Sequence, residues 1–247
     1  MFLRSILDTI KFIILLIYYC FEAFILMFFS VQKDVSGQIV LVTGSANGIG
    51  RQIALNFARL CTILVLWDTD EENNKETAEL ALANGALAVY TYKCDLCKKE
   101  EIYAVADQTC KAFLPAMIAC NQGHLVTITS VAALCGCFKL TDYSASKFAA
   151  FGFMESIAFE LRKAGKKGIK TTIVCPGFVD TKLITNAETA RPILLPVFNP
   201  EYVGKRIVDA ILKDKFYVVL PTYARLILLK IFLPEKVVSH LAEYLGI

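Results

Sequence analysis

The 247-residue sequence has little excess charge and no concentrated run of basic residues. Its 26 Lys and Arg residues nearly balance 23 Asp and Glu residues, which gives a formal net charge of +3. Nucleic-acid-binding domains usually present a clustered basic surface, so no nucleic-acid partner is expected. No internal repeat or low-complexity tract is visible, and the length favours one α/β domain with appendages.

The chain also lacks a disulfide framework. It has nine cysteines, an odd number, and Cys61 and Cys175 fall in or beside apolar stretches where free thiols behave as small hydrophobic side chains. This usage fits a reducing, cytosol-facing domain. The pairs Cys94–Cys97 and Cys135–Cys137 could suggest zinc, but the second spacing is too tight for the usual ligand pattern, so we expect no metal.

Hydrophobic residues, by contrast, are abundant at 56% and are concentrated towards the two ends. Phe12 to Phe29 is an 18-residue run with one charge, Glu22, close to the minimum length that spans a bilayer. No small-residue cleavage site follows, so residues 1–34 are predicted to be a retained hydrophobic anchor helix rather than a cleaved signal peptide. A buried core helix is the alternative, and Glu22 also leaves room for an interfacial helix or a re-entrant hairpin.

Beyond the anchor, continuous apolar runs alternate with helical segments. Such runs are typical of parallel strands that are covered by helices on both faces. Their alternation predicts an α/β fold with a Rossmann-like, doubly wound parallel sheet. Strands are predicted at residues 39–42, 62–67, 88–92, 125–129 and 171–175.

We assign residues 35–215 to this domain and residues 216–247 to an apolar C-terminal segment. A helix is predicted from Pro200 to Leu212, because proline is favoured in the first helical turn. A last strand is predicted at 216–220. Residues 223–233 are strongly apolar and carry two basic residues, so they either lie on a membrane surface or cap a lipophilic substrate pocket.

A glycine-rich turn follows the first predicted strand and opens a helix. Gly44, Gly48 and Gly50 would let the backbone approach a pyrophosphate, whose charge is met by the helix N-terminus. Asp68, at the end of the second strand, can accept hydrogen bonds from both ribose hydroxyls and would repel a 2′-phosphate, so NAD is favoured over NADP. Asp95 ends the third strand and could reach the adenine or simply form a turn.

A second motif suits proton transfer. Tyr143 and Lys147 are four residues apart, so they share one face of a predicted helix. A nearby ammonium favours the phenolate, which suits Tyr143 to general acid–base catalysis. Ser130, at a nearby strand end, could hold a substrate oxygen. Together these residues suit hydride transfer between a nicotinamide and an alcohol or ketone.

In combination, these features resemble the short-chain dehydrogenase/reductase family over roughly residues 35–215. Within that family the sequence is similar to the membrane-bound retinol and 17β-hydroxysteroid dehydrogenase branch. The resemblance implies a lipophilic alcohol or ketone as substrate, a membrane or lipid-droplet surface as partner, a location at the endoplasmic reticulum or lipid droplets, and a possible homodimer. The segments that carry it are the anchor, Leu64–Asp68, Ala112–Met117, Ser146–Phe153 and Gly168–Thr172.

The resemblance also implies a role for individual residues. Tyr143 would be the proton acceptor or donor, Lys147 would support it and bind the nicotinamide ribose, and Ser130 would position the substrate oxygen. The implied cofactor-binding residues are Gly44, Ser45, Asn47, Gly48, Ile49, Gly50, Asp68, Asp95, Tyr143, Lys147, Pro176, Gly177 and Thr181.

One family segment is missing. The family has an Asn-Asn-Ala-Gly fourth strand and a helix with a further catalytic asparagine before the Ser130 strand, and this chain has neither, a loss of roughly 40–50 residues. The junction falls near Lys111. A fused helix over about residues 99–119 could carry the chain to a Ser130 strand that pairs beside the first strand, and we expect the activity of this shortened form to be strongly reduced or absent. The alternatives to an active enzyme are a catalytically silent membrane or lipid-droplet protein and a chain that misfolds.

Overall fold

The computed structural model describes residues 2–28, 31–93, 113–181, 189 and 191–246. The chain divides into two units, one up to Lys33 and one from Asp34 onwards. Each unit is described by itself below.

The first unit is a single helix, α1 (Phe2–Phe28). Its apolar side chains are exposed in this unit, with Phe12, Ile17 and Phe21 each more than 60% accessible. Across the part of the chain that is described, no helix meets both the length and the hydrophobicity that crossing a membrane requires. The predicted N-terminal helix is therefore present, while its role as an anchor stays a prediction.

Six parallel strands form the centre of the second unit, and they belong to two sheets of three. The first sheet has the order β1 (Ile39–Thr43), β2 (Ile63–Asp68), β3 (Ala88–Lys93). The second has the order β4 (Gly123–Ile128), β5 (Ile169–Pro176), β6 (Tyr217–Leu220). All pairings are parallel, so the predicted doubly wound parallel arrangement is confirmed.

The predicted pairing of the Ser130 strand with the first strand is wrong. Within the described residues, β1 pairs with β2, and β4 pairs with β5, but β1 and β4 do not pair with each other. A Rossmann sheet of order 3-2-1-4-5-6 would place another strand between them if its fourth strand were present. Among the described residues no strand fills this place, so β1 and β4 each lie at an edge of a separate three-stranded sheet.

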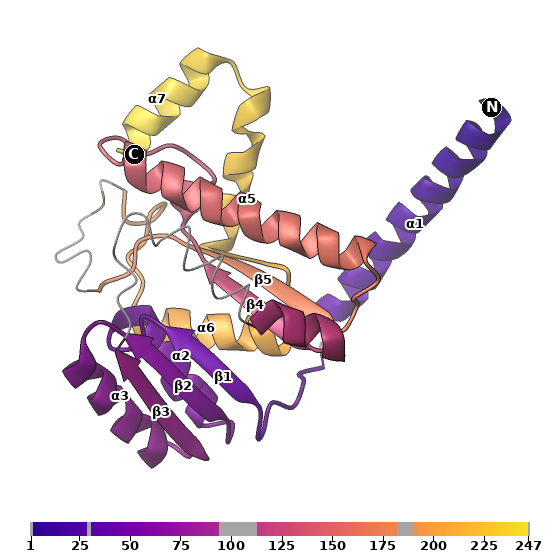
Figure 1. The fold of residues 1–247 in the computed structure, drawn as a ribbon. Helices are drawn as coiled ribbons and strands as arrows, with labels where there is room; N and C mark the ends of the chain where they lie inside the picture. Colours follow the sequence, from indigo (N-terminus) through magenta and orange to yellow (C-terminus); the bar gives the residue numbers. More distant parts are fainter. Residues whose placement is uncertain (1, 29–30, 94–112, 182–188, 190, 247) are drawn as a thin grey trace. The chain divides into compact units, whose positions relative to one another are not determined.

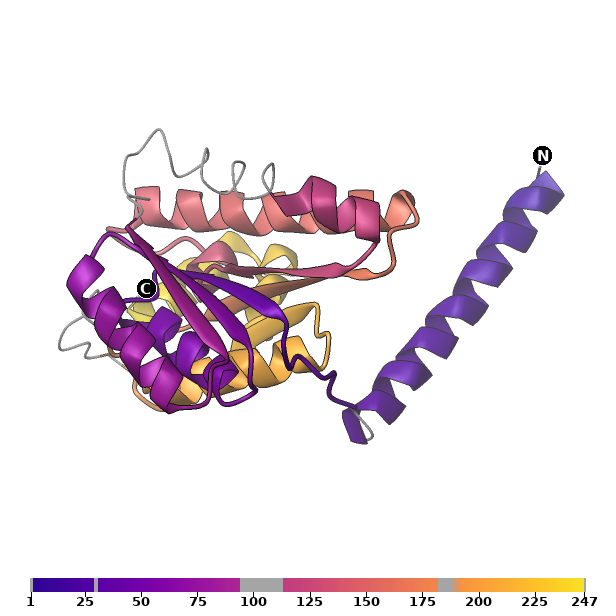
Figure 2. The same cartoon turned by 60° about the horizontal axis from the view of Figure 1, so that its bottom comes forward.

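Helices cover the two faces of these sheets differently. On one face lie α2 (Gly48–Ala58), α3 (Glu71–Ala83) and α6 (Pro200–Leu212), and on the other lies α5 (Thr141–Lys163) (Figures 1 and 2). The helix α6 is observed as predicted, and the Asn199 side chain caps it by accepting a hydrogen bond from the Glu201 N–H at 2.8 Å.

The hydrophobic core is split between these faces. One cluster joins β1, β2 and β6 to α2 and α6, and it includes the fully buried Leu64 and Leu66. The other joins β4 and β5 to α5, around Ile173 and Met154. Each fully buried leucine or isoleucine contributes about 1.5–3 kcal/mol relative to an exposed one, so both helix–sheet layers stabilise the fold.

The first sheet buries one face well and the other poorly. Leu64 and Leu66 face α2 and are fully buried, whereas the alternate side chains of Val65 and Trp67 are half-buried and Ile39 is 72% exposed. Successive strand residues point to opposite faces, so the exposed set belongs to the face away from α2. We attribute this exposure to the missing strand–helix unit, which would otherwise add apolar cover here.

The C-terminal segment follows β6 as a 3₁₀ helix, η2 (Thr222–Phe232), and a helix, α7 (Glu235–Leu245). Ala224 is the buried residue of η2, and α7 has none. The Tyr223 hydroxyl donates to the carbonyls of Ile193 and Leu194 at 3.2 and 3.0 Å, so η2 contacts the segment that follows β5. The predicted fused helix over 99–119 lies largely outside the described residues, although residues 113–120 are helical.

Candidate functional site

The glycine turn lies at the carboxyl ends of β1 and β2. The Gly44 N–H donates to the Trp67 carbonyl at 2.8 Å, which ties the turn to the neighbouring strand. Ser45 is fully buried, and its hydroxyl donates to Asn74 Oδ1 at 2.8 Å. The Ser45 side chain therefore fixes the turn from inside, and its contribution to ligand binding would be through the backbone.

Two glycines of the turn are required by geometry. A Cβ on Gly50 would lie 2.0 Å from the Gly44 carbonyl oxygen, so any larger residue would push the first helical turn away from the strand. Gly48 has a φ of +56° and begins α2, and a Cβ there would lie 3.2 Å from Thr181 Cγ2. The predicted residues Gly48 and Thr181 are thus in contact, although they are far apart in sequence.

Asp68 also lies against this turn. Its Oδ2 accepts a hydrogen bond from the Ala46 N–H at 2.9 Å, and its Oδ1 accepts one from the Asp70 N–H at 3.0 Å. Each carboxylate oxygen has two lone pairs, so both can accept a further hydrogen bond from a ribose hydroxyl. The N–H groups at the start of α2 can therefore face the pyrophosphate of a dinucleotide, while the Asp68 carboxylate faces its adenosine ribose.

The guanidinium of Arg51, in the first turn of α2, is already hydrogen-bonded within the protein. Arg51 Nε donates to the Ala46 carbonyl at 2.8 Å, and its Nη2 donates to the Asn73 carbonyl at 3.1 Å and to Glu76 Oε2 at 2.7 Å. An arginine that recognises a 2′-phosphate needs its guanidinium N–H groups free to form a paired contact. In this arrangement Arg51 instead fastens the turn to α3.

Tyr143 and Lys147 lie on the first turns of α5, as predicted. Lys147 Nζ is 5.5 Å from the centre of the Tyr143 ring, within the range of a cation–π contact. Burial lowers the pKa of Lys147 below its usual value, because desolvation disfavours the ammonium. The ammonium is thus held beside the phenol in a partly dehydrated position, where its electrostatic effect is stronger than in water.

Ser130 follows β4 and caps the short helix η1 (Val131–Ala133). Its Oγ accepts a hydrogen bond from the Ala132 N–H at 3.1 Å and donates one to the Pro176 carbonyl at 3.4 Å. The second bond is long and therefore weak, so the hydroxyl can turn to a substrate oxygen at small cost. The structure thus places Ser130 next to Pro176, at the carboxyl end of β5.

The segment after β5 links the two groups of predicted residues. Pro176, the last residue of β5, accepts a hydrogen bond from Ser130, and Thr181, at the other end of the segment, lies beside Gly48 of the glycine turn. Asn47 precedes α2 in an extended conformation, and Ile49 lies in the first turn of α2. Asp95, however, lies outside the described residues.

Asn74 is a site-supporting residue that sequence reasoning missed. It is 1% exposed, and besides accepting from Ser45 it donates from Nδ2 to the Leu66 carbonyl at 3.1 Å. It lies in a polar helix where one more asparagine is unremarkable. The sequence could have revealed Asn74 through its spacing, because it lies on the same helix face as the buried Thr77 and Ala81.

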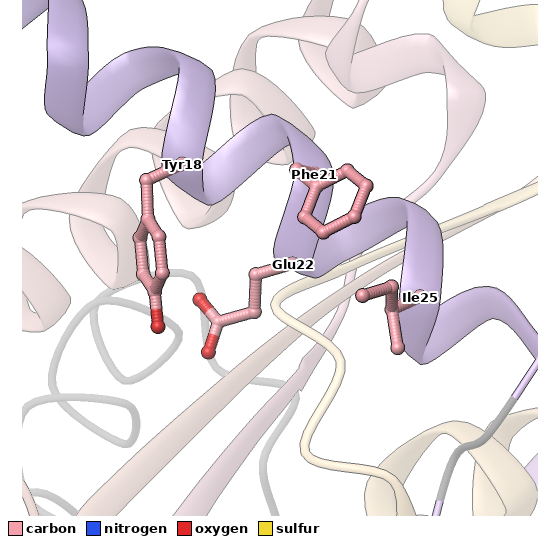
Figure 3. A pocket seen from close by; sticks show the side chains of 4 residues that line it. All are labelled: Tyr18, Phe21, Glu22 and Ile25. Carbon is pink, nitrogen blue, oxygen red and sulfur yellow. The ribbon is translucent and has the colours of Figure 1, made fainter.

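A surface hollow of about 200 Å³ lies elsewhere, on α1. Its lining residues come from that helix alone, and the Tyr18 hydroxyl and the Glu22 carboxylate extend to the same side of it, with Phe21 and Ile25 alongside (Figure 3). Such a hollow on a single helix encloses no ligand. Among the described residues, no group of three or more His, Cys, Asp or Glu side chains is arranged to hold a metal ion.

Comparison with known proteins agrees with the glycine turn and the Tyr143–Lys147 pair described above. The family model described as short chain dehydrogenase matches residues 38–111 and 106–192. The two matches meet at 106–111, close to the predicted junction, as expected of a chain that has lost an internal piece of the family pattern. The chain therefore matches the family pattern in two pieces, with an internal segment of the pattern missing between them.

Relatives agree with this picture. Human epidermal retinol dehydrogenase 2 is 43% identical over 261 residues, covering 87% of this chain and 84% of the relative. Short-chain dehydrogenase/reductase family 16C member 6 from Bos taurus is 38% identical over 293 residues, covering 99% of this chain and 92% of the relative. That alignment is longer than this 247-residue chain, so the relative has positions with no counterpart here.

Solved structures share the fold. A short-chain dehydrogenase/reductase from Burkholderia phymatum in complex with NAD has a TM-score of 0.65 and 23% identity, covering 81% of this chain and 95% of its own. A short-chain dehydrogenase from Sphingobium yanoikuyae in complex with NADPH has a TM-score of 0.64 and 19% identity, covering 83% and 95%. With its glycine turn, its Tyr–Lys pair and these relatives, the chain belongs to the short-chain dehydrogenase family, in the retinol dehydrogenase branch.

Proposed function

We propose that this chain is an NAD-dependent oxidoreductase that interconverts a lipophilic alcohol and the corresponding aldehyde or ketone, with a retinoid as the first candidate. The observation that carries the proposal is the carboxyl end of β5 and the loop after it: Pro176, the last residue of β5, accepts a hydrogen bond from Ser130, and Thr181 in the loop lies beside Gly48 of the glycine turn. This one stretch of chain therefore touches both the cofactor-binding turn and the substrate-orienting serine. Relatives named as retinol dehydrogenases support the substrate class.

The preference for NAD over NADP rests on charge. Asp68 places a carboxylate at the ribose position, where a 2′-phosphate would meet like charge. Arg51 is held by Ala46, Asn73 and Glu76 and would have to give up these bonds to neutralise a phosphate. Both features favour a ribose with free hydroxyls.

The proton chemistry belongs to the chain itself. The nicotinamide, when bound, supplies the hydride acceptor or donor. The Tyr143 phenolate would take the proton of the substrate alcohol during oxidation, and the resulting hydroxyl would return it during reduction, while Ser130 Oγ donates to the substrate oxygen. Lys147 Nζ lies 5.5 Å from the centre of the Tyr143 ring, beside the group that exchanges the proton.

A lipid environment fits the apolar surfaces. The exposed side chains of α1 and of η2, which include Leu226, Ile231 and Phe232, are unusual for a protein surface in water. We propose that α1 attaches the enzyme to the endoplasmic reticulum or lipid-droplet surface. A homodimer through α5, whose Phe148, Phe153 and Phe159 are exposed, is a further part of this proposal.

The test combines binding with turnover on the purified full-length chain. A saturating concentration of NAD, about 100 times Kd, should stabilise the protein by about 2.7 kcal/mol and raise its melting temperature. Incubation with NAD and retinol should produce NADH. Tyr143→Phe should keep the NAD-dependent rise in melting temperature and lose turnover. Equal turnover in wild type and Tyr143→Phe would refute the proposed proton donor.

A second candidate function follows from the split sheet. In the described structure β1 and β4 each leave one edge unpaired, and the first sheet exposes part of an apolar face. A central strand next to the cofactor turn is a large loss, so a catalytically silent protein at a membrane or lipid droplet remains the competing proposal. A chain that attaches to membranes, melts cooperatively and shows neither an NAD-dependent shift nor turnover would favour it.

A further inference from the structure

The loop between Ser130 and Tyr143 contains two cysteines that the proposed dehydrogenase chemistry does not use. Cys135 and Cys137 flank Gly136 and are free thiols in this structure. Cys135 is buried at 8% exposure, Cys137 is half-buried, and Gly136 is exposed with no atom within 4 Å of the position that a Cβ would take. One thiol of the pair is therefore shielded, while the other is next to an open part of the loop.

Hydrogen bonds hold both cysteines in place. The Cys135 thiol donates to the Val131 carbonyl at 3.7 Å, and the Cys137 thiol donates to the Cys135 carbonyl at 3.9 Å. The Cys137 N–H donates to Ser144 Oγ at 3.3 Å, which joins the loop to α5. Lys230 Nζ donates to the Leu134 carbonyl at 2.6 Å, so a cation from η2 lies beside the pair.

The two thiols are also unequal in acidity. The pKa of the Cys137 thiol is lowered to about 6, chiefly by interaction with the Cys135 side chain and then by the Ser144 hydroxyl and the charge of Lys230, against the opposing effect of burial. Interaction with Cys137, together with burial, raises the pKa of Cys135. Near neutral pH, Cys137 is the nucleophile and Cys135 keeps its proton.

A bond between them is within reach. Residues two apart have Cα atoms at most about 7 Å apart, and disulfides span Cα separations of up to about 6.8 Å. A ring this small is strained, and strained disulfides have more oxidising potentials and are easily reduced. A disulfide here would be reversible rather than structural.

We infer that Cys135-Gly136-Cys137 is a reversible thiol-oxidation site, with Cys137 as the attacking and Cys135 as the resolving cysteine, and with a hydroperoxide as the oxidant. This inference does not depend on the proposed dehydrogenase activity. It concerns the loop that joins Ser130 to Tyr143, so oxidation would constrain the spacing of these two residues.

The chemistry balances in two steps. In the first step the Cys137 thiolate attacks the distal oxygen of the hydroperoxide and the O–O bond breaks. The departing alkoxide or hydroxide takes a proton from solvent. The Cys137 sulfur is thereby oxidised to a sulfenic acid, and the peroxide is reduced. The Cys135 sulfur then attacks the Cys137 sulfur, the S–O bond breaks, and the hydroxide leaves as water with the Cys135 proton. A later thiol reductant returns both cysteines to thiols.

The first test is peptide mapping of the full-length chain. After mild hydrogen peroxide treatment and alkylation of the remaining thiols, the peptide that contains both cysteines should be two hydrogens lighter than its reduced form, and dithiothreitol should reverse this. Cys61 and Cys120, which are exposed, serve as internal comparators and should stay alkylated. Preferential oxidation of the comparators, or irreversible oxidation of Cys137 alone, would overturn the inference.

Two matched variants test the assignment of roles. Cys135→Ser should stop at a Cys137 sulfenic acid that a dimedone probe traps, whereas Cys137→Ser should leave Cys135 unoxidised, because its buried thiol keeps its proton. Trapping at Cys135 in the second variant would refute the assignment. Both readouts can be made without enzymatic turnover.

The rate of alkylation gives an independent measurement on the unmodified chain. Because more of Cys137 than of an ordinary thiol is thiolate near neutral pH, Cys137 should react faster than an ordinary thiol at about pH 6 to 7, and this advantage should shrink as the pH rises. The acting groups are Cys135, Ser144 and Lys230. Equal pH profiles for Cys137 and Cys120 would contradict the activated thiol.

Discussion

Gly50→Ala separates two opposing physical effects at the cofactor turn. Gly50 lies in the first turn of α2, where alanine is intrinsically better than glycine by about 0.8–1.0 kcal/mol. The new methyl group, however, would lie 2.0 Å from the Gly44 carbonyl oxygen. That oxygen belongs to the backbone of the turn and cannot rotate away as a side chain would.

The clash should outweigh the propensity. Relief requires the helix to move away from the turn, and overpacking of this kind typically costs about 1–3 kcal/mol. A net destabilisation of about 1 kcal/mol would lower the melting temperature by about 2–4 °C for a chain of this length. The movement would also displace the N–H groups at the start of α2, so the NAD-dependent rise in melting temperature should be lost.

Gly152→Ala is the matched control, because it makes the same chemical change inside a helix. Gly152 lies in α5 and has no atom within 4 Å of its added Cβ. This variant should gain about 0.5–1 kcal/mol and melt about 1–4 °C higher. Differential scanning fluorimetry with and without NAD measures both variants. A Gly50→Ala protein that melts above wild type and still responds to NAD would refute the geometry of the turn.

Two further predictions concern the same site. Lys147→Met removes a buried ammonium, so turnover should fall while the melting temperature stays equal or rises. Because the pKa of Lys147 in the folded protein is lower than its unfolded value of 10.5, the free energy of unfolding of the wild type should increase with pH from the folded pKa up to 10.5. Urea titrations repeated across pH should show this increase in the wild type and not in the variant. Asp68→Ser should shift the ratio of NAD to NADP affinity by about tenfold or more towards NADP, measured by isothermal titration; an unchanged ratio would show that Asp68 does not contact the ribose.

Local motifs were predictable because their signals are local. The strand ends, the glycine turn, the Asp68 position and the Tyr143–Lys147 pair all depend on spacing within one or two elements, and the structure places them as expected. Arg51 and Asn74 were not recognised as supports of the turn, because their partners are backbone carbonyls and a buried serine on other elements. Such contacts exist only after tertiary packing.

Sheet continuity was the prediction that failed, for a physical reason. Pairing β4 directly with β1 would satisfy two rows of backbone groups, but each strand is also fixed by its own helices: β1 by α2, and β4 by its parallel ladder with β5 and the cover of α5. Closing the gap would require both helix–sheet layers to shift together, with disruption of cores that hold residues such as Leu64 and Ile173 at 0% exposure. In this structure two well-packed layers outweigh one row of hydrogen bonds. The cofactor turn stays attached to one layer and the Tyr–Lys pair to the other; the packing of α6 against α2 joins the two sheets, and the segment from Pro176 to Thr181 lies against both groups of site residues.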